Sequence, residues 1–395
     1  MIQVNNGIQM REWQKQAIFS WIQNQHRGII SVATGGGKTI FAMFCISHLF
    51  NKSLIDYCVI IVPTITLRDQ WYVNLLNSTN IEQDLISTKI KIGCKILILT
   101  NLTAQKIIDK IENPKILVVY DECHRYGTKN NLSIFNNTSY TLGLTATIER
   151  KYDSGVSEIL IPKIGKVIFD YDIRKAISDG VVMNYRLINI QTHFNSEELE
   201  IYQKLTRKII STNNILKKEQ NQPDLHKKLE LLLFKRKKLI NETQQRDLVA
   251  CKLIIENINK KKIIFCETIN QCISIQKLCN NHGLETLIYH SKMSQKSRIS
   301  TLHSFYNNIS HTLIGCKALD EGFDVPDIEM GIIVSQTKTN RQRIQRLGRT
   351  IRICDGKQTP DVYTLYTTQD EENELILEES KNKNLSVMWL GISNE

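Results

Sequence analysis

Residues 28–44 read GIISVATGGGKTIFAMF, and this stretch decides the fold of the first half of the chain. Its first part, Gly28–Val32, is apolar and β-branched, which predicts a short buried strand. The apolar run Ile40–Phe44 predicts a helix. Between them, three glycines precede Lys38 and Thr39. The order strand, tight loop, helix N-terminus is typical of a phosphate-binding loop, because glycines let backbone N–H groups turn towards phosphate oxygens and the helix dipole adds positive potential.

The side chains of this loop have distinct expected roles. The residues expected to surround the phosphates are Thr34, Gly35, Gly36, Gly37, Lys38 and Thr39. Lys38 is expected to reach the β- and γ-phosphates, and the Thr39 hydroxyl to bind Mg²⁺. The general pattern G-x-x-x-x-G-K-[ST] has a glycine five residues before Gly37, where this chain has Val32. The alternative is a glycine turn that precedes a lysine by chance, and the flanking strand and helix favour the phosphate loop.

An acidic pair follows a second predicted strand. The run Lys115–Tyr120 is apolar, and Asp121 and Glu122 come directly after it. In open α/β sheets, ligands bind outside the carboxyl ends of the strands. We expect Asp121 to hold Mg²⁺ through water and Glu122 to polarise the attacking water, because phosphoryl transfer needs mainly positioning and charge neutralisation. The alternative is an acidic pair in an ordinary loop. Together with Lys38, these carboxylates form the predicted catalytic group for hydrolysis of a nucleoside triphosphate.

Length and composition predict two domains of α/β class. The chain has 395 residues, more than the roughly 250–300 at which a single core stops growing. Strand-like and helical patterns alternate in both halves, which predicts two parallel-sheet domains, residues 1–168 and 169–395. The first residues lack a basic region followed by an apolar stretch, and no apolar run approaches the roughly 20 residues of a membrane span. The ten cysteines include no C-x-x-C pair. We therefore expect a cytoplasmic protein with reduced thiols, no membrane contact and no zinc site.

The positive charge is concentrated in one segment. Between Ile201 and Lys262 there are 16 Lys and Arg against 6 acids, which accounts for 10 of the net charge of +11. Helical spacing of apolar residues and a break at 221–224 predict a helical hairpin, inserted at about 196–258 in the second domain. Its run Lys235, Arg236, Lys237, Lys238 is expected to contact a phosphate backbone. The alternative is a solvated helix face in a lysine-rich protein, and the sequence leaves both interpretations open.

The tetrapeptide Asp121–His124, DECH, resembles the box of superfamily 2 helicases and translocases. Further motifs of that family follow in the right order over nearly the whole chain. The matching segments are Met10–Gln14 upstream of the phosphate loop, Val62–Trp71 (motif Ia), Ile98–Asn101, Gly143–Arg150 (motif III), Lys262–Glu267 (motif IV), Tyr289–Ser291 with Arg298, Ala318–Pro326 (motif V) and Gln345–Arg352 (motif VI). Met10 replaces a leucine and Ile148 a proline. The resemblance is greatest to the branch of XPB-type repair helicases, phage recombination helicases and restriction-enzyme motors.

This resemblance implies two tandem RecA-like domains with ATP and Mg²⁺ bound between them. It implies that Gln14 reads the adenine, with Arg11 beside it. It further places a group from the second domain at the nucleotide: Glu321, Gly322 and Asp324 of motif V, and Gln345, Arg349 and Arg352 of motif VI. An arginine supplied across a cleft stabilises charge on the γ-phosphoryl oxygens and accelerates hydrolysis by about 10³- to 10⁵-fold in enzymes that use one. Hydrolysis is then expected to require closure of the two domains.

The resemblance also implies a track for nucleic acid. The residues expected to contact it are Pro63, Thr64, Arg68, Thr100, His290 and Ser291, and those expected to couple it to the nucleotide are His124, Thr145 and Thr147. The leading hypothesis is an ATP-dependent helicase or translocase acting on DNA, with a nuclease or loader as protein partner. One alternative is a nucleic-acid-binding switch or adaptor with slow hydrolysis. Another is an RNA helicase, because RNA is distinguished by its 2′-hydroxyl and A-form shape, which these motifs do not read.

Overall fold

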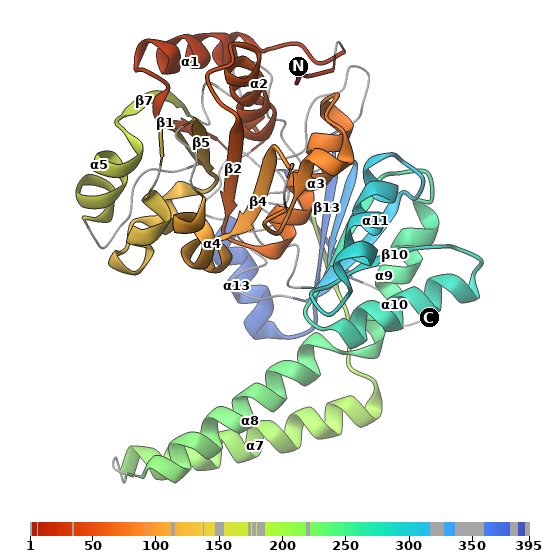
Figure 1. Ribbon diagram of the computed structural model, residues 1–395. Coiled ribbons are helices and arrows are strands. Elements are labelled where there is room, and N and C mark those ends of the chain that lie inside the picture. Colours follow the sequence, from red (N-terminus) through yellow and green to blue (C-terminus); the bar gives the residue numbers. More distant parts are fainter. Residues whose placement is uncertain are drawn as a thin grey trace.

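The computed structural model describes two seven-stranded sheets in which all paired strands run parallel (Figure 1). The described residues are 2–5, 7–33, 35–91, 93–111, 115–136, 138–146, 154–172, 175, 179, 186–218, 222–316, 328–335, 359–379 and 386–391. Helices pack against the sheets, so the predicted class of two tandem RecA-like α/β domains is confirmed. None of the helices in these ranges combines the length and apolar character needed to cross a membrane.

The first sheet has the strand order β3-β4-β2-β5-β6-β1-β7. The elements of this domain are α1 (Glu12–Gln23), β1 (Arg27–Val32), α2 (Lys38–Asn51), β2 (Tyr57–Val62), α3 (Ile65–Ser78), η1 (Gln83–Leu85), β3 (Ile86–Ser87), β4 (Ile96–Thr100), α4 (Asn101–Ile107), η2 (Ile108–Lys110), β5 (Ile116–Tyr120), η3 (Cys123–Tyr126), η4 (Lys129–Phe135), β6 (Tyr140–Thr145), η5 (Val156–Leu160), α5 (Ile161–Ile164) and β7 (Val167–Tyr171). Since β7 pairs with β1, this sheet extends three residues beyond the expected boundary at 168.

Alternating apolar residues give the first sheet two buried faces. Ile30 and Ile60 point into the cluster built with α1, α2 and α3. Their neighbours Ile29 and Ile61 point into the opposite cluster, with α4 and α5. This arrangement follows from the period of two along a strand. It also explains why these strands read as continuous apolar runs in the sequence.

The second sheet has the order β10-β11-β9-β12-β13-β8-β14. Its domain contains β8 (Arg186–Gln191), α7 (Ser196–Lys218), α8 (Pro223–Asn241), α9 (Gln244–Glu256), β9 (Lys262–Cys266), α10 (Ile269–Asn281), β10 (Leu287–Tyr289), α11 (Gln295–Tyr306), β11 (Thr312–Cys316), β12 (Met330–Ile333), β13 (Asp361–Tyr366), α13 (Gln369–Glu379) and β14 (Ser386–Gly391). Place by place, the order matches the first sheet. Thus β9 occupies the position of β2, and β8 the position of β1.

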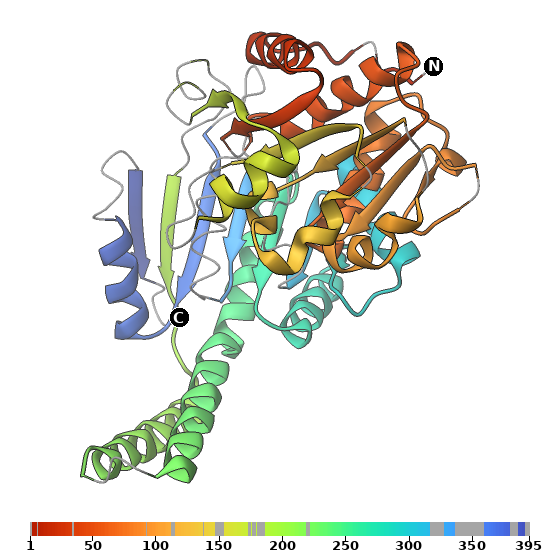
Figure 2. The ribbon, with the colours of Figure 1, turned by 60° about the vertical axis from the view of Figure 1, so that its left-hand side comes forward.

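The predicted helical hairpin is formed by α7 and α8, which project away from both sheets (Figures 1 and 2). A capping box begins α7: the backbone N–H of Glu198 donates to Asn195 Oδ1 at 2.9 Å, and that of Asn195 donates to Glu198 Oε2 at 3.0 Å. The hairpin spans 196–241 and is shorter than the predicted 196–258. The remainder is α9, whose Ala250 and Ile254 are buried in the core of the second domain.

Part of the basic segment is buried and serves the fold. Arg246 has no exposed surface, and its guanidinium donates to both carboxylate oxygens of Glu371 at 2.7 Å. This buried ion pair ties α9 to α13. Lys261 and Lys262 are also buried, at the start of β9. These cations therefore do not belong to the exposed basic surface that the charge count implied. That surface lies mainly on the hairpin, and Lys252 of α9 is also exposed.

The two domains meet through α3 and α11, which lie side by side in Figure 1. Asp69 of α3 is fully buried, and Arg298 of α11 donates from Nε to its Oδ2 at 2.6 Å. The Tyr289 hydroxyl donates to the same oxygen at 3.3 Å. Val73 of α3 joins the apolar cluster of the second domain. The domains thus share a buried ion pair and an apolar contact.

Replacing Asp69 by alanine is expected to destabilise the protein by about 3–5 kcal/mol, because it leaves the Arg298 cation buried without its partner. Denaturant unfolding followed by circular dichroism measures this loss. The matched control is Asp84→Ala, which removes a carboxylate from an exposed ion pair with Lys91 and should change stability little. Equal stability of Asp69→Ala and the unmodified protein would contradict the structural role assigned to the pair.

Candidate nucleotide-hydrolysis site

The phosphate loop requires its glycines. Gly35 and Gly37 have φ angles of 80° and 99°, in the left-handed region that favours glycine. A Cβ atom on Gly36 would lie 2.5 Å from Cγ1 of Val32, so a side chain has no space there. Directly after Gly37, α2 begins, and the first N–H groups of a helix have no partners within it. The loop therefore presents backbone donors to an anion. The predicted loop residue Thr34 lies outside the described residues.

Lys38 faces the acidic pair across the carboxyl edge of the first sheet. Strands β1 and β5 both pair with β6, and all three run parallel, so the residues that follow β1 and β5 lie at the same edge. The Lys38 ammonium lies 3.3 Å from Glu122 Oε1, and both side chains are largely buried, at 11% and 16% exposure. The structure thus brings together two of the residues predicted to be catalytic, with a cation placed to meet phosphate oxygens.

Asp121 is held by two hydrogen bonds. The indole Nε1–H of Trp71 donates to Oδ2 at 2.8 Å, and the backbone N–H of Glu122 donates to Oδ1 at 3.0 Å. Burial, with a smaller contribution from the neighbouring Glu122 carboxylate, raises the pKa of Asp121 to about 6, although Lys38 and the Trp71 hydrogen bond act in the opposite direction. A bound cation would favour the ionised form. Trp71 was not predicted as a site residue. The sequence feature that could have identified Trp71 is its position at the end of the motif Ia segment.

Glu122 has a left-handed backbone, with φ 50° and ψ 46°. Such a conformation costs a non-glycine residue on the order of 1–3 kcal/mol and persists only where the surroundings enforce it. The turn leaves Glu122 in contact with Lys38 and, through Oε2, 3.4 Å from His124 Nδ1. The same His124 nitrogen lies 2.9 Å from Thr145 Oγ1 at the end of β6. The predicted coupling residues His124 and Thr145 are therefore in contact, whereas Thr147 lies outside the described residues.

The donors present fit a magnesium ion that arrives with nucleotide phosphates. Thr39 is the second residue of α2, and Asp121 follows β5, so one hydroxyl and one carboxylate come from the two predicted ligand positions. In the part of the chain that the structure describes, no group of three or more His, Cys, Asp or Glu side chains is placed to hold a metal by itself. Mg²⁺ typically takes one or two carboxylates and completes its shell with phosphate oxygens and water.

Arg11 and Gln14 lie against the phosphate loop. The Gln14 amide donates from Nε2 to the Gly37 carbonyl at 3.1 Å, and Arg11 donates to the Gly36 carbonyl at 3.3 Å. The backbone N–H of Arg11 donates in turn to Gln14 Oε1 at 2.9 Å. These bonds fix the start of α1 to the loop, so the segment is well placed beside a nucleotide. Recognition of adenine by Gln14 stays a prediction.

The second-domain residues expected at the nucleotide stay predictions. Motifs V and VI lie outside the described residues, together with their predicted site residues Glu321, Gly322, Asp324, Gln345, Arg349 and Arg352. The described elements on either side of these motifs in the sequence are β11, which ends before motif V, and β12 and β13, which come before and after motif VI.

Apart from Arg68 and the basic run of the hairpin, the predicted nucleic-acid residues lie at the carboxyl ends of strands in both domains. Thr64 follows β2 and caps α3, accepting a hydrogen bond from the Leu67 backbone N–H at 3.3 Å. Thr268 follows β9 and caps α10 in the same way, accepting from Gln271 at 3.2 Å. Because β2 and β9 occupy the same place in their sheets, the two threonines are structurally equivalent. Thr268 was not predicted as a site residue, although its position directly after motif IV in the sequence could have identified it.

The other predicted track residues differ in their surroundings. Pro63 and Thr100 lie half-buried at the ends of β2 and β4, and Thr100 Oγ1 is 2.9 Å from Thr103 Oγ1. Ser291 is exposed and His290 half-buried, directly after β10. Arg68 donates to Asp69 Oδ1 at 3.0 Å, and its side chain is 15% exposed. A phosphate contact by these residues stays a prediction.

Comparison with known proteins identifies the family of this chain. The model of the type III restriction enzyme res subunit matches residues 7–150, and that of the helicase conserved C-terminal domain matches residues 245–354. The DNA 3'-5' translocase XPB2 of Sulfurisphaera tokodaii is 25% identical over 369 residues, covering 89% of this chain and 80% of XPB2. The chain spans 55% to 80% of the length of the first four curated relatives it matches.

Two solved structures share the fold. Dbp5 of S. cerevisiae, bound to RNA and ADP BeF3, has a TM-score of 0.61 at 14% identity and covers 96% of this chain and 89% of its own. The type ISP restriction-modification enzyme LlaBIII, bound to DNA, has a TM-score of 0.58 at 15% identity and covers 98% of this chain and 31% of its own. These structures show the fold alone. The two family models and the curated relatives, together with the ordered motifs, lead to the conclusion that the chain belongs to superfamily 2 of the ATP-dependent helicases, in the branch of XPB-like and restriction-enzyme motors.

Proposed function

We propose that this protein is a DNA translocase or helicase that couples ATP hydrolysis between its two domains to movement on DNA. One observation carries the proposal: a continuous series of contacts links the nucleotide loop to motif III. Lys38 lies 3.3 Å from Glu122, Glu122 lies 3.4 Å from His124, and His124 lies 2.9 Å from Thr145. A change of charge at the phosphates can thus alter the hydrogen bonding of a strand end that faces the proposed track.

In the proposed cycle, the residues of this chain bind and orient the reactants. Lys38 and the backbone donors of the loop hold the phosphates, and Glu122 positions the attacking water. A magnesium ion held by Thr39 and Asp121 would neutralise phosphate charge. Arg349 or Arg352, from the second domain, would complete charge stabilisation when the domains close. Release of the products would let the domains rotate back, with the buried contact between α3 and α11 as the pivot.

DNA is the proposed track because XPB2, which matches 89% of this chain, is named a DNA translocase. The fold alone does not distinguish the polymers, since the similar structures include one protein bound to RNA and one bound to DNA. We further propose that the motor works with a protein partner, a nuclease or a loader, and in the cytoplasm. The nine cysteines in the described residues are buried and form no disulfide there, which suits a reducing compartment.

The test is steady-state ATP hydrolysis measured alone and with single-stranded DNA, duplex DNA and RNA in parallel. We expect strong stimulation by DNA and a dependence on Mg²⁺. Stimulation by RNA alone would replace the DNA assignment by an RNA helicase. Slow hydrolysis that responds to no polymer would instead favour the nucleic-acid-binding switch or adaptor. Strand displacement on a forked duplex, followed by a fluorescent reporter, separates unwinding from translocation.

The basic run of the hairpin gives a second test of the track. Replacing Lys235, Arg236, Lys237 and Lys238 by glutamine is expected to weaken DNA binding with little sequence dependence and to flatten its salt dependence. Each lost phosphate contact should reduce the slope of log K against log salt by about 0.7–0.9. Fluorescence anisotropy at several salt concentrations measures the slope. The control for net charge is a variant that removes four exposed lysines of the first domain: Lys15→Gln, Lys52→Gln, Lys91→Gln, Lys110→Gln. An unchanged slope would assign the run to a solvated helix face.

A further inference from the structure

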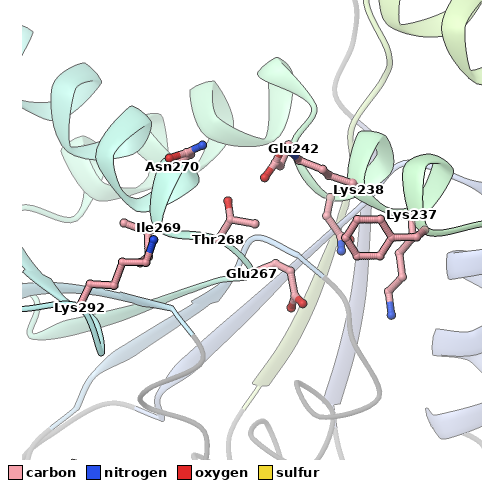
Figure 3. A pocket seen from close by; sticks show the side chains of 10 residues that line it. Lys237, Lys238, Glu242, Glu267, Thr268, Ile269, Asn270 and Lys292 are labelled. Carbon is pink, nitrogen blue, oxygen red and sulfur yellow. Dashed lines mark ion pairs between the residues drawn. The ribbon is translucent and has the colours of Figure 1, made fainter. Parts of the chain in front are cut away.

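A cavity of about 420 Å³ lies where the hairpin meets the second domain. The end of α8 forms one wall and the first residues of α10 form another. Lys292, after β10, completes the lining. Figure 3 shows Lys292 on one side and Lys237 and Lys238 on the other, with Glu267 and Thr268 between them. The cavity thus adjoins Thr268, the residue that corresponds to Thr64 of motif Ia.

The α8 wall is a single helix face. Its lining residues are Phe234, Lys237, Lys238, Asn241 and Glu242. Their spacing of three or four residues places them above one another. The other two members of the basic run, Lys235 and Arg236, do not line the cavity. Helical geometry therefore divides the run into a pair that borders the cavity and a pair that faces elsewhere.

Phe234 is the unusual member of this face. Its side chain is 66% exposed, although burial of a phenylalanine is strongly favourable. An exposed aromatic ring at the border of a cavity offers a flat surface for stacking. Neighbouring cations would strengthen binding of a nucleic-acid strand there, since single-strand-binding sites combine aromatic side chains for base stacking with positive charge for the backbone.

The charges of the lining favour an anion. Three lysines border the cavity, Lys237, Lys238 and Lys292, against the carboxylates of Glu242 and Glu267. Lys238 and Glu242 form a loose ion pair, with 3.9 Å between Nζ and Oε2. Among the residues that the structure describes, no ion pair joins Lys237 or Lys292 to an acid. These two ammonium groups are thus available to a phosphate.

We propose that this cavity binds one nucleotide of a single nucleic-acid strand, with its base stacked on Phe234 and its phosphate held by Lys237, Lys238 and Lys292. The inference rests on the proposed function and makes it more specific, because it places the tracked strand between hairpin and second domain. A volume of about 420 Å³ falls in the range of small-ligand sites. A duplex does not suit the site, since its base faces are covered by stacking and only base edges are accessible.

The experiment compares two fluorescein-labelled oligonucleotides by anisotropy: an oligothymidylate, and the same backbone with a central run of abasic residues. Phe234→Ala is expected to weaken binding of the oligothymidylate by about 10-fold, within the range measured for base–aromatic stacking. The loss should nearly vanish on the abasic strand, which retains the phosphates. Phe234→Tyr should bind like the unmodified protein. Lys238→Gln should weaken binding of both strands more than Lys235→Gln, its matched neighbour outside the cavity.

Two results would overturn the site. One is an unchanged affinity of Phe234→Ala for the oligothymidylate, and the other is an equal loss on both strands. Thermal unfolding of each variant checks the fold, which the exposed position of Phe234 should preserve. If the unmodified protein binds DNA and its ATP hydrolysis is stimulated by DNA, these results contradict only the proposed cavity site and leave the proposed function in place. If it binds neither oligonucleotide and no polymer stimulates hydrolysis, the proposed function and the cavity both fail.

Discussion

Replacing Lys38 by alanine is expected to reduce DNA-stimulated ATP hydrolysis by about 100- to 1,000-fold, the loss typical of removing one preorganised group that stabilises transition-state charge. The Lys38 ammonium lies at the start of α2, 3.3 Å from Glu122, where the γ-phosphate is expected. The variant should retain DNA binding, because the predicted track lies at other strand ends. Phosphate release measures hydrolysis, and anisotropy with labelled DNA measures binding.

Lys52→Ala provides the matched control for this variant. Lys52 caps the opposite end of α2 and is exposed, so its loss removes the same charge from the same helix without touching the loop. This control should hydrolyse ATP normally. Turnover in Lys38→Ala equal to that of the control would show that the phosphate site lies elsewhere, and loss of DNA binding would show that Lys38 serves the fold.

Replacing Glu122 by glutamine is expected to slow hydrolysis by about 100- to 10,000-fold while ATP remains bound, since glutamine keeps the size of the side chain and removes its capacity to act as a base. The variant also removes the negative charge opposite Lys38 and beside Asp121. ATP affinity should therefore be maintained or increased. Single-turnover hydrolysis measures the chemical step, and a fluorescent ATP analogue measures affinity.

The control for Glu122→Gln is Glu12→Gln, a change at an exposed glutamate in the first turn of α1. It should leave hydrolysis and affinity unaltered. Rapid single-turnover hydrolysis in Glu122→Gln would assign the positioning of water to another group. Weak ATP binding would instead mean that the Lys38–Glu122 pair organises the loop before the nucleotide arrives.

The nucleotide site was the most predictable part of this molecule, because its chemistry requires particular residues at short spacing. The predicted strands Gly28–Val32 and Lys115–Tyr120 are confirmed as β1 and β5, each with one terminal residue of difference. Lys38 and Glu122 were expected at one site, and they lie in contact. Trp71, which orients Asp121 from α3, was missed because its role depends on how α3 packs over the sheet.

Charge was the least predictable property, since the sequence does not show which cations are buried. Arg246 counted as part of the basic segment, yet its partner Glu371 lies 125 positions later in the chain. Arg68 forms an ion pair with Asp69, which the sequence did not indicate, and its predicted contact with phosphate stays a prediction. The apolar pattern likewise continued from the hairpin into α9, so periodicity alone did not show where the hairpin ends.

The shared surface of the domains bears on how the chain can be divided. A cut between residues 172 and 186 would separate the two sheets, a few residues after the boundary at 168 that the sequence predicts. The first fragment would then present the Asp69 carboxylate and Val73 to water, and the second would present Arg298 with the apolar Leu302 and Phe305. Each fragment is expected to aggregate when produced by itself and to reassociate with the other when both are produced together. The chain thus has two domains by topology, but we expect that neither domain is stable in solution without the other.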